Sequence, residues 1–174
     1  TGVSRTDAYF RADFAAENRR RFYEQYPEAA GKKIVLWAPT FRGNAGDFHN
    51  DYTAVQLQQA EELSAALGEA YHVVLKLHPH RAKQRPDTPC RLRTEELLPV
   101  ADVMSTDYSS ILYEFMLLNK PVVLDGADLS DYAKSRGFYM DYDTIPAVHV
   151  TDRALLPAAV RCAAEHPDGL PFRE

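Results

Sequence analysis

Strand-like and helix-like segments alternate along most of this chain, and this alternation restricts the fold more than any other feature of the sequence. Short apolar runs that stop at Gly, Pro or polar turns are typical of buried strands. Such runs lie at 34–38, 72–77, 103–105, 121–124 and 148–150, with a further short strand expected at 90–92. Segments with helical spacing or helical composition lie at 8–26, 53–67, 95–100, 110–118, 129–135 and 154–164. The pattern predicts βαβ units, and therefore an α/β fold with a parallel sheet of five or six strands covered by helices on both faces.

Composition and size narrow the class of protein. The 174 residues are enough for one well-buried core, and neither a repeat nor a linker divides them, so one domain over 1–174 is expected. A net charge of -5 argues against a nucleic-acid partner. No apolar run approaches the ~20 residues of a membrane span, and the first ten residues contain no signal-peptide apolar region. The first residue is Thr1, which favours a fragment of a longer protein.

Two cysteines and the capping residues complete the local picture. Cys90 and Cys162 lie far apart without a Cys-x-x-Cys spacing, so two reduced thiols in a cytosolic protein are expected. Thr53-x-x-Gln56 resembles a capping box at the start of a helix that Gly68 ends. Asp152 is placed to cap the last helix.

Polar residues follow the carboxyl end of each main predicted strand. These residues are Pro39 to Arg42, His78 to Arg81, Ser105 to Ser110, and Asp125 with Gly126. In open α/β sheets, ligands bind in the crevice outside the carboxyl ends of the strands. Segments that are distant in the sequence are therefore expected to converge on one ligand site.

The densest of these segments is the turn "STDYSS" at 105–110, which suits a phosphate group. A helix that starts near Ser109 presents free backbone N–H groups beside two serine hydroxyls. Cationic partners for a second phosphate are available from His78, Arg42 and Arg81. Helix capping by Asp107, Ser109 or Ser110 explains the same turn equally well, so both readings stay open.

Other binding and catalytic motifs are missing from the sequence. It contains no Gly-x-x-x-x-Gly-Lys-[Ser/Thr] P-loop and no Gly-x-Gly-x-x-Gly after the first strand. It also has no Gly-x-Ser-x-Gly nucleophile elbow. The His78-Pro79-His80 segment lacks a third ligand at a persuasive spacing, so no metal and no cofactor are expected.

Several segments in a fixed order resemble one known family. They are "TGVSRTD", "IVLWAPTFR", "VVLKLHPH", "ADVMSTDYSSILYEFMLLNKPVVL" and "RGFYMDY", and they cover most of the chain. Together they resemble the carboxyl-terminal half of the CDP-glycerol glycerophosphotransferase family, the polymerases and primases of wall teichoic acid. The first segment departs from the family's Gly-x-Pro-Arg-Asn-Asp at Ser4 and Thr6 but keeps Arg5 and Asp7.

The resemblance implies a GT-B arrangement in which two Rossmann-like domains face each other and the second holds most of the donor. This chain is similar to the second domain alone. The implied catalytic residue is His78, as the phosphate partner of the leaving group. The expected substrate-binding residues are Arg5, Pro39, Thr40, Arg42, Lys76, Leu77, Thr106, Asp107, Tyr108, Ser109 and Ser110.

The implied reaction moves glycerol phosphate from CDP-glycerol to a teichoic acid polymer and releases CMP. The implied partners are this donor and, through the missing domain, the polymer acceptor, with the complete enzyme peripheral at the cytoplasmic face of the membrane. The alternatives are a related GT-B transferase that uses CDP-ribitol or a nucleotide sugar, and a nucleotide-binding module without catalysis.

Three other features of the sequence are explained by structure alone. The favoured interpretation of the run Arg19-Arg20-Arg21 is a solvated helix face. The less favoured interpretation is that these arginines contact anionic lipid or teichoic phosphate. Trp37 belongs to the core. Tyr142, like its neighbours Phe138 and Tyr139, belongs to a packed flap rather than to a stacking platform for a base.

Overall fold

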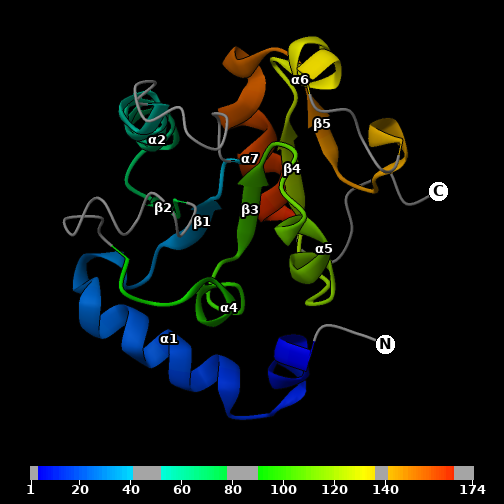
Figure 1. The fold of residues 1–174 in the computed structure, drawn as a ribbon. Helices are drawn as coiled ribbons and strands as arrows, with labels where there is room; N and C mark the ends of the chain where they lie inside the picture. The colour runs from blue at the N-terminus through cyan, green and yellow to red at the C-terminus, as the bar shows by residue number, and fades with distance from the viewer. Residues whose placement is uncertain (1–3, 41–51, 78–89, 136–140, 167–174) are drawn as a thin grey trace.

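A computed structural model of the chain describes residues 4–40, 52–77, 90–135 and 141–166, and Figure 1 shows its fold. Five parallel strands in these residues form one sheet in the order β2-β1-β3-β4-β5. The strands are β1 (Lys33–Trp37), β2 (Tyr71–Leu75), β3 (Val103–Thr106), β4 (Val122–Asp125) and β5 (Val148–Val150). The α/β fold with a parallel sheet is confirmed.

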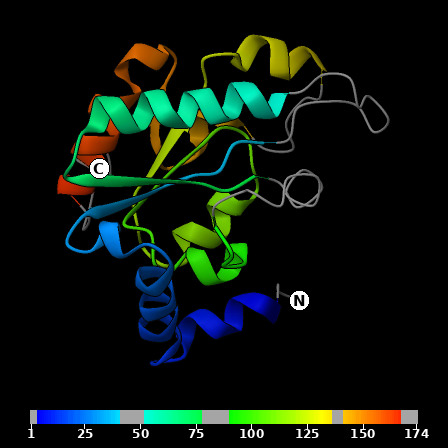
Figure 2. The same cartoon turned by 90° about the vertical axis from the view of Figure 1, so that its left-hand side faces the viewer.

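Helices cover both faces of the sheet, as Figure 2 shows. One face packs against α1 (Phe14–Gln25), α4 (Thr94–Leu97) and α5 (Ile111–Met116). The other face packs against α2 (Tyr52–Leu67) and α7 (Leu156–Glu165). The helix α6 (Leu129–Ser135) follows the carboxyl end of β4. Short 3-10 helices lie at η1 (Ser4–Phe10), η2 (Pro27–Ala29), η3 (Tyr142–Thr144) and η4 (Arg153–Leu155).

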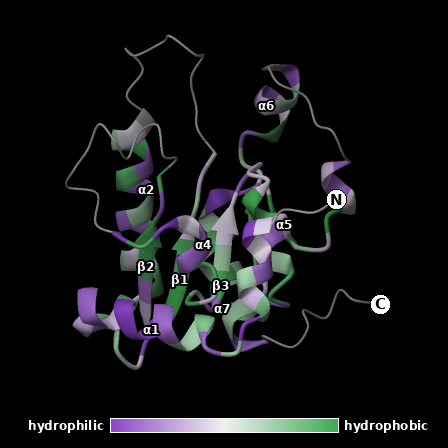
Figure 3. Ribbon diagram, turned by 60° about the horizontal axis from the view of Figure 1, so that its bottom comes forward, coloured by the Kyte–Doolittle hydropathy of each residue, from purple (hydrophilic) through white to green (hydrophobic). Residues whose placement is uncertain are grey.

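The strands are buried on both faces, which explains their continuous apolar runs. In β1, Leu36 faces Phe22 and Phe115 in the cluster under α1 and α5. Its neighbour Val35 faces the opposite cluster with α2 and α7, in which Val160 is fully buried. Figure 3 shows the same contrast, with hydrophobic strands in the middle and a largely hydrophilic α1 outside. Trp37 is only 2% exposed, so its expected place in the core is confirmed.

Two elements differ from the sequence-based expectations. The helix expected over 8–26 is divided into η1 and α1, and Phe10 at the end of η1 is 75% exposed. The division has a tertiary cause, because Arg5 and Tyr9 in η1 bond to a carboxylate of α5. The expected strand at 90–92 is wrong: this segment has no strand pairing, and the Lys76 ammonium bonds to its carbonyls instead.

The sheet order reverses between β1 and β3. After β1 the chain crosses to β2 on one side, and it later returns to add β3 on the other side. In a sheet of this order, the reversal opens a crevice at the carboxyl ends of the two strands where the order switches. The Cα partners Leu36 with Met104 and Trp37 with Ser105 fix the register there.

Among the residues that the structure describes, none of the helices has both the length and the hydropathy that a bilayer span needs.

Candidate functional site

The switch point between β1 and β3 brings together two of the predicted polar segments. Thr40 lies just beyond β1, and the turn from Thr106 to Ser110 ends β3. The two segments are more than 60 residues apart in the sequence, as the separation of 67 between Thr40 and Asp107 shows. The structure therefore places the predicted convergence at the position where α/β sheets of this order bind their ligands.

Asp107 fastens the two strand ends to each other. Its Oδ1 accepts hydrogen bonds from the Thr40 backbone N–H at 2.7 Å, from the Thr40 hydroxyl, and from the Tyr108 backbone N–H at 2.6 Å. The residue is only 4% exposed. A carboxylate with several donors in a buried place holds those donors rigidly. Asp107 thus fixes the start of both loops that leave the switch point.

Two further bonds reinforce this fastening. The Thr106 hydroxyl donates to the Ala38 carbonyl at 2.6 Å, and both residues are buried. The Gln56 side-chain amide donates to the Thr40 carbonyl at 3.2 Å. Gln56 was expected to act in a capping box, but α2 begins at Tyr52 and the Gln56 side chain reaches outside its helix instead. Sequence reasoning missed this link between α2 and β1, although a glutamine on a mostly apolar helix face was a signal.

Ser109 and Ser110 lie between Asp107 and α5. The backbone N–H groups of Leu112 and Tyr113 bond to the carbonyls of Ser109 and Ser110, so the first turn of the helix starts at these serines. Ser110 is exposed, and its side chain makes no capping hydrogen bond. The capping explanation therefore does not account for Ser110. Since α5 has only 6 residues, its dipole is weak, and any anion here must rely mainly on direct hydrogen bonds.

Aromatic side chains cover the sheet beside this turn. Tyr108 stacks on Tyr132 of α6 with ring centroids 4.0 Å apart, and its hydroxyl donates to Asp128 at 2.8 Å. Tyr142 packs edge-on against His149 and is buried, as expected for it, while Phe138 and Tyr139 of the predicted packed flap lie outside the described residues. Burial, together with the nearby Asp107 carboxylate, raises the pKa of Tyr142 well above its usual range. This phenol therefore stays protonated and serves the packing.

The predicted residues after β2 are only partly within the described chain. Leu77 is buried with Trp37, and the Lys76 ammonium donates to the carbonyls of Leu92 and Cys90. Lys76 therefore holds the 90–92 segment against the sheet edge. His78, Arg42 and Arg81 lie outside the described residues.

The remaining predicted residues, Arg5 and Pro39, belong to different surroundings. Pro39 is buried at the end of β1, next to Thr40. Arg5 makes a two-point ion pair with Glu114 of α5, and Tyr9 donates to the same carboxylate at 3.3 Å. Neither Glu114 nor Tyr9 was singled out from the sequence. The buried glutamate in the apolar "ILYEF" helix was the available signal.

The arginine run of α1 has internal partners. Arg21 pairs with Glu96 at 2.9 Å, Arg20 pairs with Glu24, and Arg19 donates to the Val100 carbonyl at 3.3 Å. Arg20 is exposed as expected for a solvated helix face, whereas Arg19 and Arg21 join α1 to the 96–100 segment. In the ranges that the structure describes, no group of three or more His, Cys, Asp or Glu side chains is arranged to hold a metal ion.

Comparison with solved structures identifies the class of fold. The chain superposes on a variant of the wall teichoic acid polymerase TagF soaked with CDPG, with a TM-score of 0.70, 22% identity, and coverage of 96% of this chain and 42% of that one. A second TagF variant matches with a TM-score of 0.72, 21% identity, and coverage of 95% and 44%. The fold is therefore that of one Rossmann-like half of a GT-B glycosyltransferase.

Comparison with protein families then gives the family. Residues 1–167 match the model of the CDP-Glycerol:Poly(glycerophosphate) glycerophosphotransferase family, and the chain belongs to this family. It is 36% identical over 158 residues to the teichoic acid poly(ribitol-phosphate) polymerase of Bacillus spizizenii, covering 84% of this chain and 25% of the relative. It is 33% identical over 156 residues to the teichoic acid glycerol-phosphate primase of Bacillus subtilis, covering 83% and 37%. The chain thus spans between a quarter and about two fifths of the length of these relatives.

Proposed function

We propose that this chain is the donor-binding domain, over residues 1–174, of a transferase that moves glycerol phosphate from CDP-glycerol to a teichoic acid polymer and releases CMP. The observation that carries the proposal is the β1–β3 switch point, where Asp107 holds Thr40 and the serine turn at the carboxyl edge of the sheet. Membership of the family supplies the reaction class.

The diphosphate of the donor is proposed to lie across the switch point. Ser109 and Ser110 offer hydroxyl and backbone donors on one side, and Pro39 with Thr40 borders the nucleotide on the other. In the sequence, Arg42 follows β1 and His78 follows β2, and these two parallel strands end at the same edge of the sheet. Negative charge develops on the CMP leaving group during the transfer, and donors aimed at that charge lower the barrier. His78 is proposed as the residue that stabilises it.

The role of the domain follows from how much of the relatives it covers. A second domain of the complete polypeptide is proposed to bind the polymer acceptor and to supply the base that activates its hydroxyl. The isolated domain is then expected to bind the donor weakly and to turn nothing over. The acceptor also suggests that the complete enzyme works peripherally at the cytoplasmic face of the membrane.

CDP-ribitol is the second candidate donor, and a specific observation favours it. Two of the similar relatives are the teichoic acid poly(ribitol-phosphate) polymerase, at 36% identity, and the teichoic acid ribitol-phosphate primase of Bacillus spizizenii, at 33% identity over 151 residues. Glycerol and ribitol donors share the CDP group and differ only in the polyol. The switch-point contacts proposed here serve both.

A donor screen on the complete protein tests the proposal. Calorimetric titration with CDP-glycerol, CDP-ribitol, CMP and a UDP-sugar is expected to show binding of one CDP-polyol and of CMP, and weaker binding of the UDP-sugar. Tight binding of the UDP-sugar alone would indicate instead that the protein uses a nucleotide sugar as its donor. Binding of CDP-polyol without release of CMP in the presence of acceptor would identify a module without catalysis.

Steady-state kinetics of three variants tests the residues. His78→Ala is expected to lower kcat/KM by about a hundredfold or more, the range found when a donor to a developing negative charge is removed. Ser110→Ala is expected to lower it less, because the backbone donors remain. Cys162→Ser serves as the control, since Cys162 is exposed on α7 and remote from the switch point. Unchanged kinetics for His78→Ala would remove His78 from the mechanism.

A further inference from the structure

Glu114 is a buried carboxylate in the helix that follows the serine turn. It lies one helical turn after Ser110 and is one of the three buried residues of α5, with Leu112 and Phe115. Its side chain is only 11% exposed. A carboxylate in such a place needs several hydrogen bonds to remain charged.

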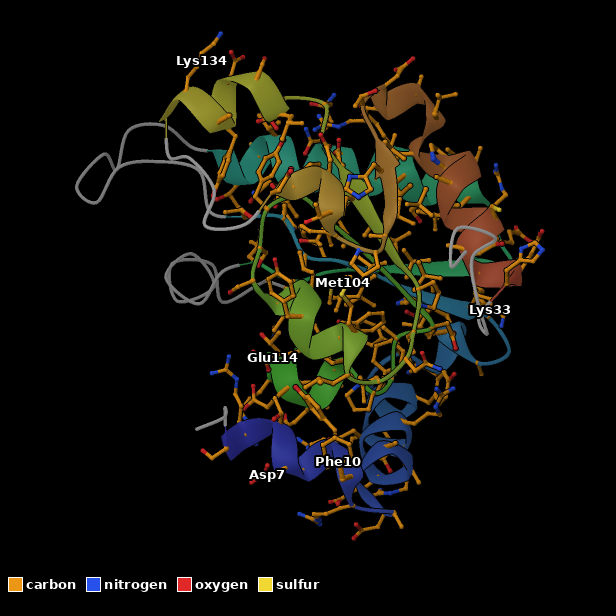
Figure 4. The ribbon with its side chains drawn as sticks, turned by 90° about the vertical axis from the view of Figure 1, so that its right-hand side faces the viewer. Asp7, Phe10, Lys33, Met104, Glu114 and Lys134 are labelled. Atoms are coloured by element: carbon orange, nitrogen blue, oxygen red, sulfur yellow. The ribbon has the colours of Figure 1, made fainter. Side chains whose placement is uncertain are left out.

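Both oxygens of Glu114 are bonded to residues of η1. Arg5 Nε donates to Oε2 at 3.1 Å, and Arg5 Nη2 donates to Oε1. The Tyr9 hydroxyl donates to Oε2 at 3.3 Å. Burial, together with the charge of Glu114, raises the pKa of Tyr9, so the phenol remains a donor. Figure 4 shows Glu114 on the part of α5 that faces η1.

The ion pair with Glu114 engages only two of the five N–H groups of the Arg5 guanidinium. Of its five N–H groups, Glu114 engages one on Nε and one on Nη2, and the Arg5 side chain is still 57% exposed. Figure 2 places the N-terminal end of η1 on the side of the molecule toward which β1 and β2 run. Through Glu114, Arg5 is held to α5, the helix that begins just after Ser110 beyond the carboxyl end of β3.

We propose that Glu114 is a positioning residue, which orients Arg5 so that its free N–H groups meet the phosphates of the donor. The inference rests on the proposed function. A bidentate carboxylate fixes the plane of a guanidinium, and a fixed plane loses less entropy when it binds an anion. In this arrangement Arg5 and Glu114 act on the donor as one unit, although 109 residues separate them.

A second ion pair in the same domain provides a matched control. Arg21 Nη1 lies 2.9 Å from Glu96 Oε1, and the side chains are 42% and 11% exposed. The pair joins α1 to the start of α4 and involves no residue of the candidate site. Because the exposures of the two pairs are similar, a purely structural role predicts similar consequences when either glutamate is neutralised.

The test compares Glu114→Gln with Glu96→Gln in the complete enzyme. Glu114→Gln is expected to raise the KM for the CDP-polyol donor by about tenfold with a smaller change in kcat, because binding in the ground and transition states is lost together. Glu96→Gln is expected to leave the donor KM unchanged. Thermal unfolding of both variants shows that the difference is not one of stability.

Coupling between the two residues gives a second readout. Arg5→Ala combined with Glu114→Gln is expected to bind the donor no worse than Arg5→Ala alone, since residues that act as a unit are not additive. Arg5→Lys, which cannot form the bidentate pair, is expected to raise the donor KM as Glu114→Gln does, and it keeps the test usable if Glu114→Gln does not fold.

Two outcomes overturn the inference, and they are distinguishable from failure of the proposed function. An unchanged donor KM in Glu114→Gln, or additive effects in the double variant, would show that Glu114 does not act through Arg5, while the wild-type enzyme still uses a CDP-polyol. A wild-type enzyme that neither binds nor uses a CDP-polyol would overturn the proposed function and this inference together.

Discussion

An aspartate lies at each end of β3 and accepts a hydrogen bond from a backbone N–H at one end of β1, but the surroundings of the two aspartates differ. Before the strand, Asp102 Oδ2 accepts from the Ile34 backbone N–H at 2.7 Å. After the strand, Asp107 Oδ1 accepts from the Thr40 backbone N–H, also at 2.7 Å. Each aspartate thus reaches from β3 to a backbone donor at one end of β1, and together they lock the central pair of the sheet at both edges.

The surroundings of Asp102 are closed by other protein groups. The Lys120 ammonium donates to the carbonyls of Pro99 at 2.7 Å and Ala101 at 2.6 Å, and Arg19 donates to the carbonyl of Val100 between them. Three successive carbonyls before the strand are therefore occupied by cationic side chains of the same domain. These contacts hold the amino edge together within the protein.

At the carboxyl edge, by contrast, Asp107 leads directly into the exposed Ser110 and the start of α5. The comparison teaches that one kind of hydrogen bond can join β1 to β3 in a closed environment at one edge and hold the exposed loops of the candidate site at the other.

The largest expected effect separates the two aspartates. Asp107→Ala leaves the Thr40 and Tyr108 N–H groups without their acceptor and releases both loops of the candidate site. We expect kcat/KM of the complete enzyme to fall by about a hundredfold or more, because a shift of ~1 Å in positioning groups has effects of this size. Steady-state kinetics with the CDP-polyol donor measures it.

Asp102→Ala is the matched control for this change. It removes the acceptor of the backbone N–H of Ile34, a fully buried residue, at about 1–3 kcal/mol of unfolding free energy, and it leaves the carboxyl edge in place. Its kcat/KM is expected to stay within about tenfold of the wild type, a much smaller loss than that of a displaced positioning group. If Asp102→Ala reduced kcat/KM as much as Asp107→Ala, the two edges would not have different roles.

A pH effect of intermediate size sharpens the description of the amino edge. Burial, with a contribution from Arg19, lowers the pKa of the Lys120 ammonium from 10.5 to about 8. The unfolded chain binds this proton more tightly than the folded protein does. The free energy of unfolding therefore rises as the pH increases from about 8 toward 10.5, and this gain is lost as the pH falls back through 8.

Urea unfolding of the wild type and Lys120→Met at pH 8 and pH 9.5 measures this effect. The wild type is expected to gain roughly 1–2 kcal/mol relative to the variant over this range. Buried tyrosines titrate alike in both proteins and cancel in the difference. A difference that does not change with pH would show that Lys120 keeps its ordinary pKa in the folded protein.

The smallest effects come from two neighbouring hydroxyls of β3. Thr106→Val removes the bond to the Ala38 carbonyl, and we expect a loss of about 1 kcal/mol of unfolding free energy. Ser105 Oγ is buried and has no hydrogen-bond partner within the described residues. Ser105→Ala is therefore expected to be neutral or slightly stabilising, because a hydroxyl buried without a partner is unfavourable. Equal losses in the two variants would refute the distinction, and chemical denaturation checks it.

Much of the fold was predictable because the strands are buried on both faces. Runs such as Ile34 to Trp37 are continuously apolar, so their periodicity is unambiguous, and Gly68, with a φ of +79°, ends α2 as predicted. Contacts between distant segments were not predictable. The aromatic spacing over 8–26 indicated one helix, but the bonds of Arg5 and Tyr9 to Glu114 draw η1 toward α5.

The candidate site was predictable as a place but not as a set of contacts. The rule that ligands bind at the carboxyl ends of parallel strands predicted that Thr40 and the turn after β3 would lie together, and the bonds between Thr40 and Asp107 confirm that they do. It did not reveal that Asp107 faces Thr40, or that Gln56 supports it from α2, because both bonds depend on the packing of elements distant in sequence. The residue types of Asp107 and Gln56 do not indicate which groups their side chains contact.

The position of β1 in the sheet has a consequence for how the chain is made. β1 lies between β2 and β3, and both follow it in the sequence. The N–H groups of Ile34 and Thr40 donate to aspartates that lie 68 and 67 residues later in the sequence. A nascent chain emerges from the ribosome amino terminus first, so β1 keeps one unpaired edge until β3 and Asp107 have been synthesised. The pairing of β1 with β3 and the link between Thr40 and Asp107 therefore both depend on the same late segment, and a chain that ends before it has neither.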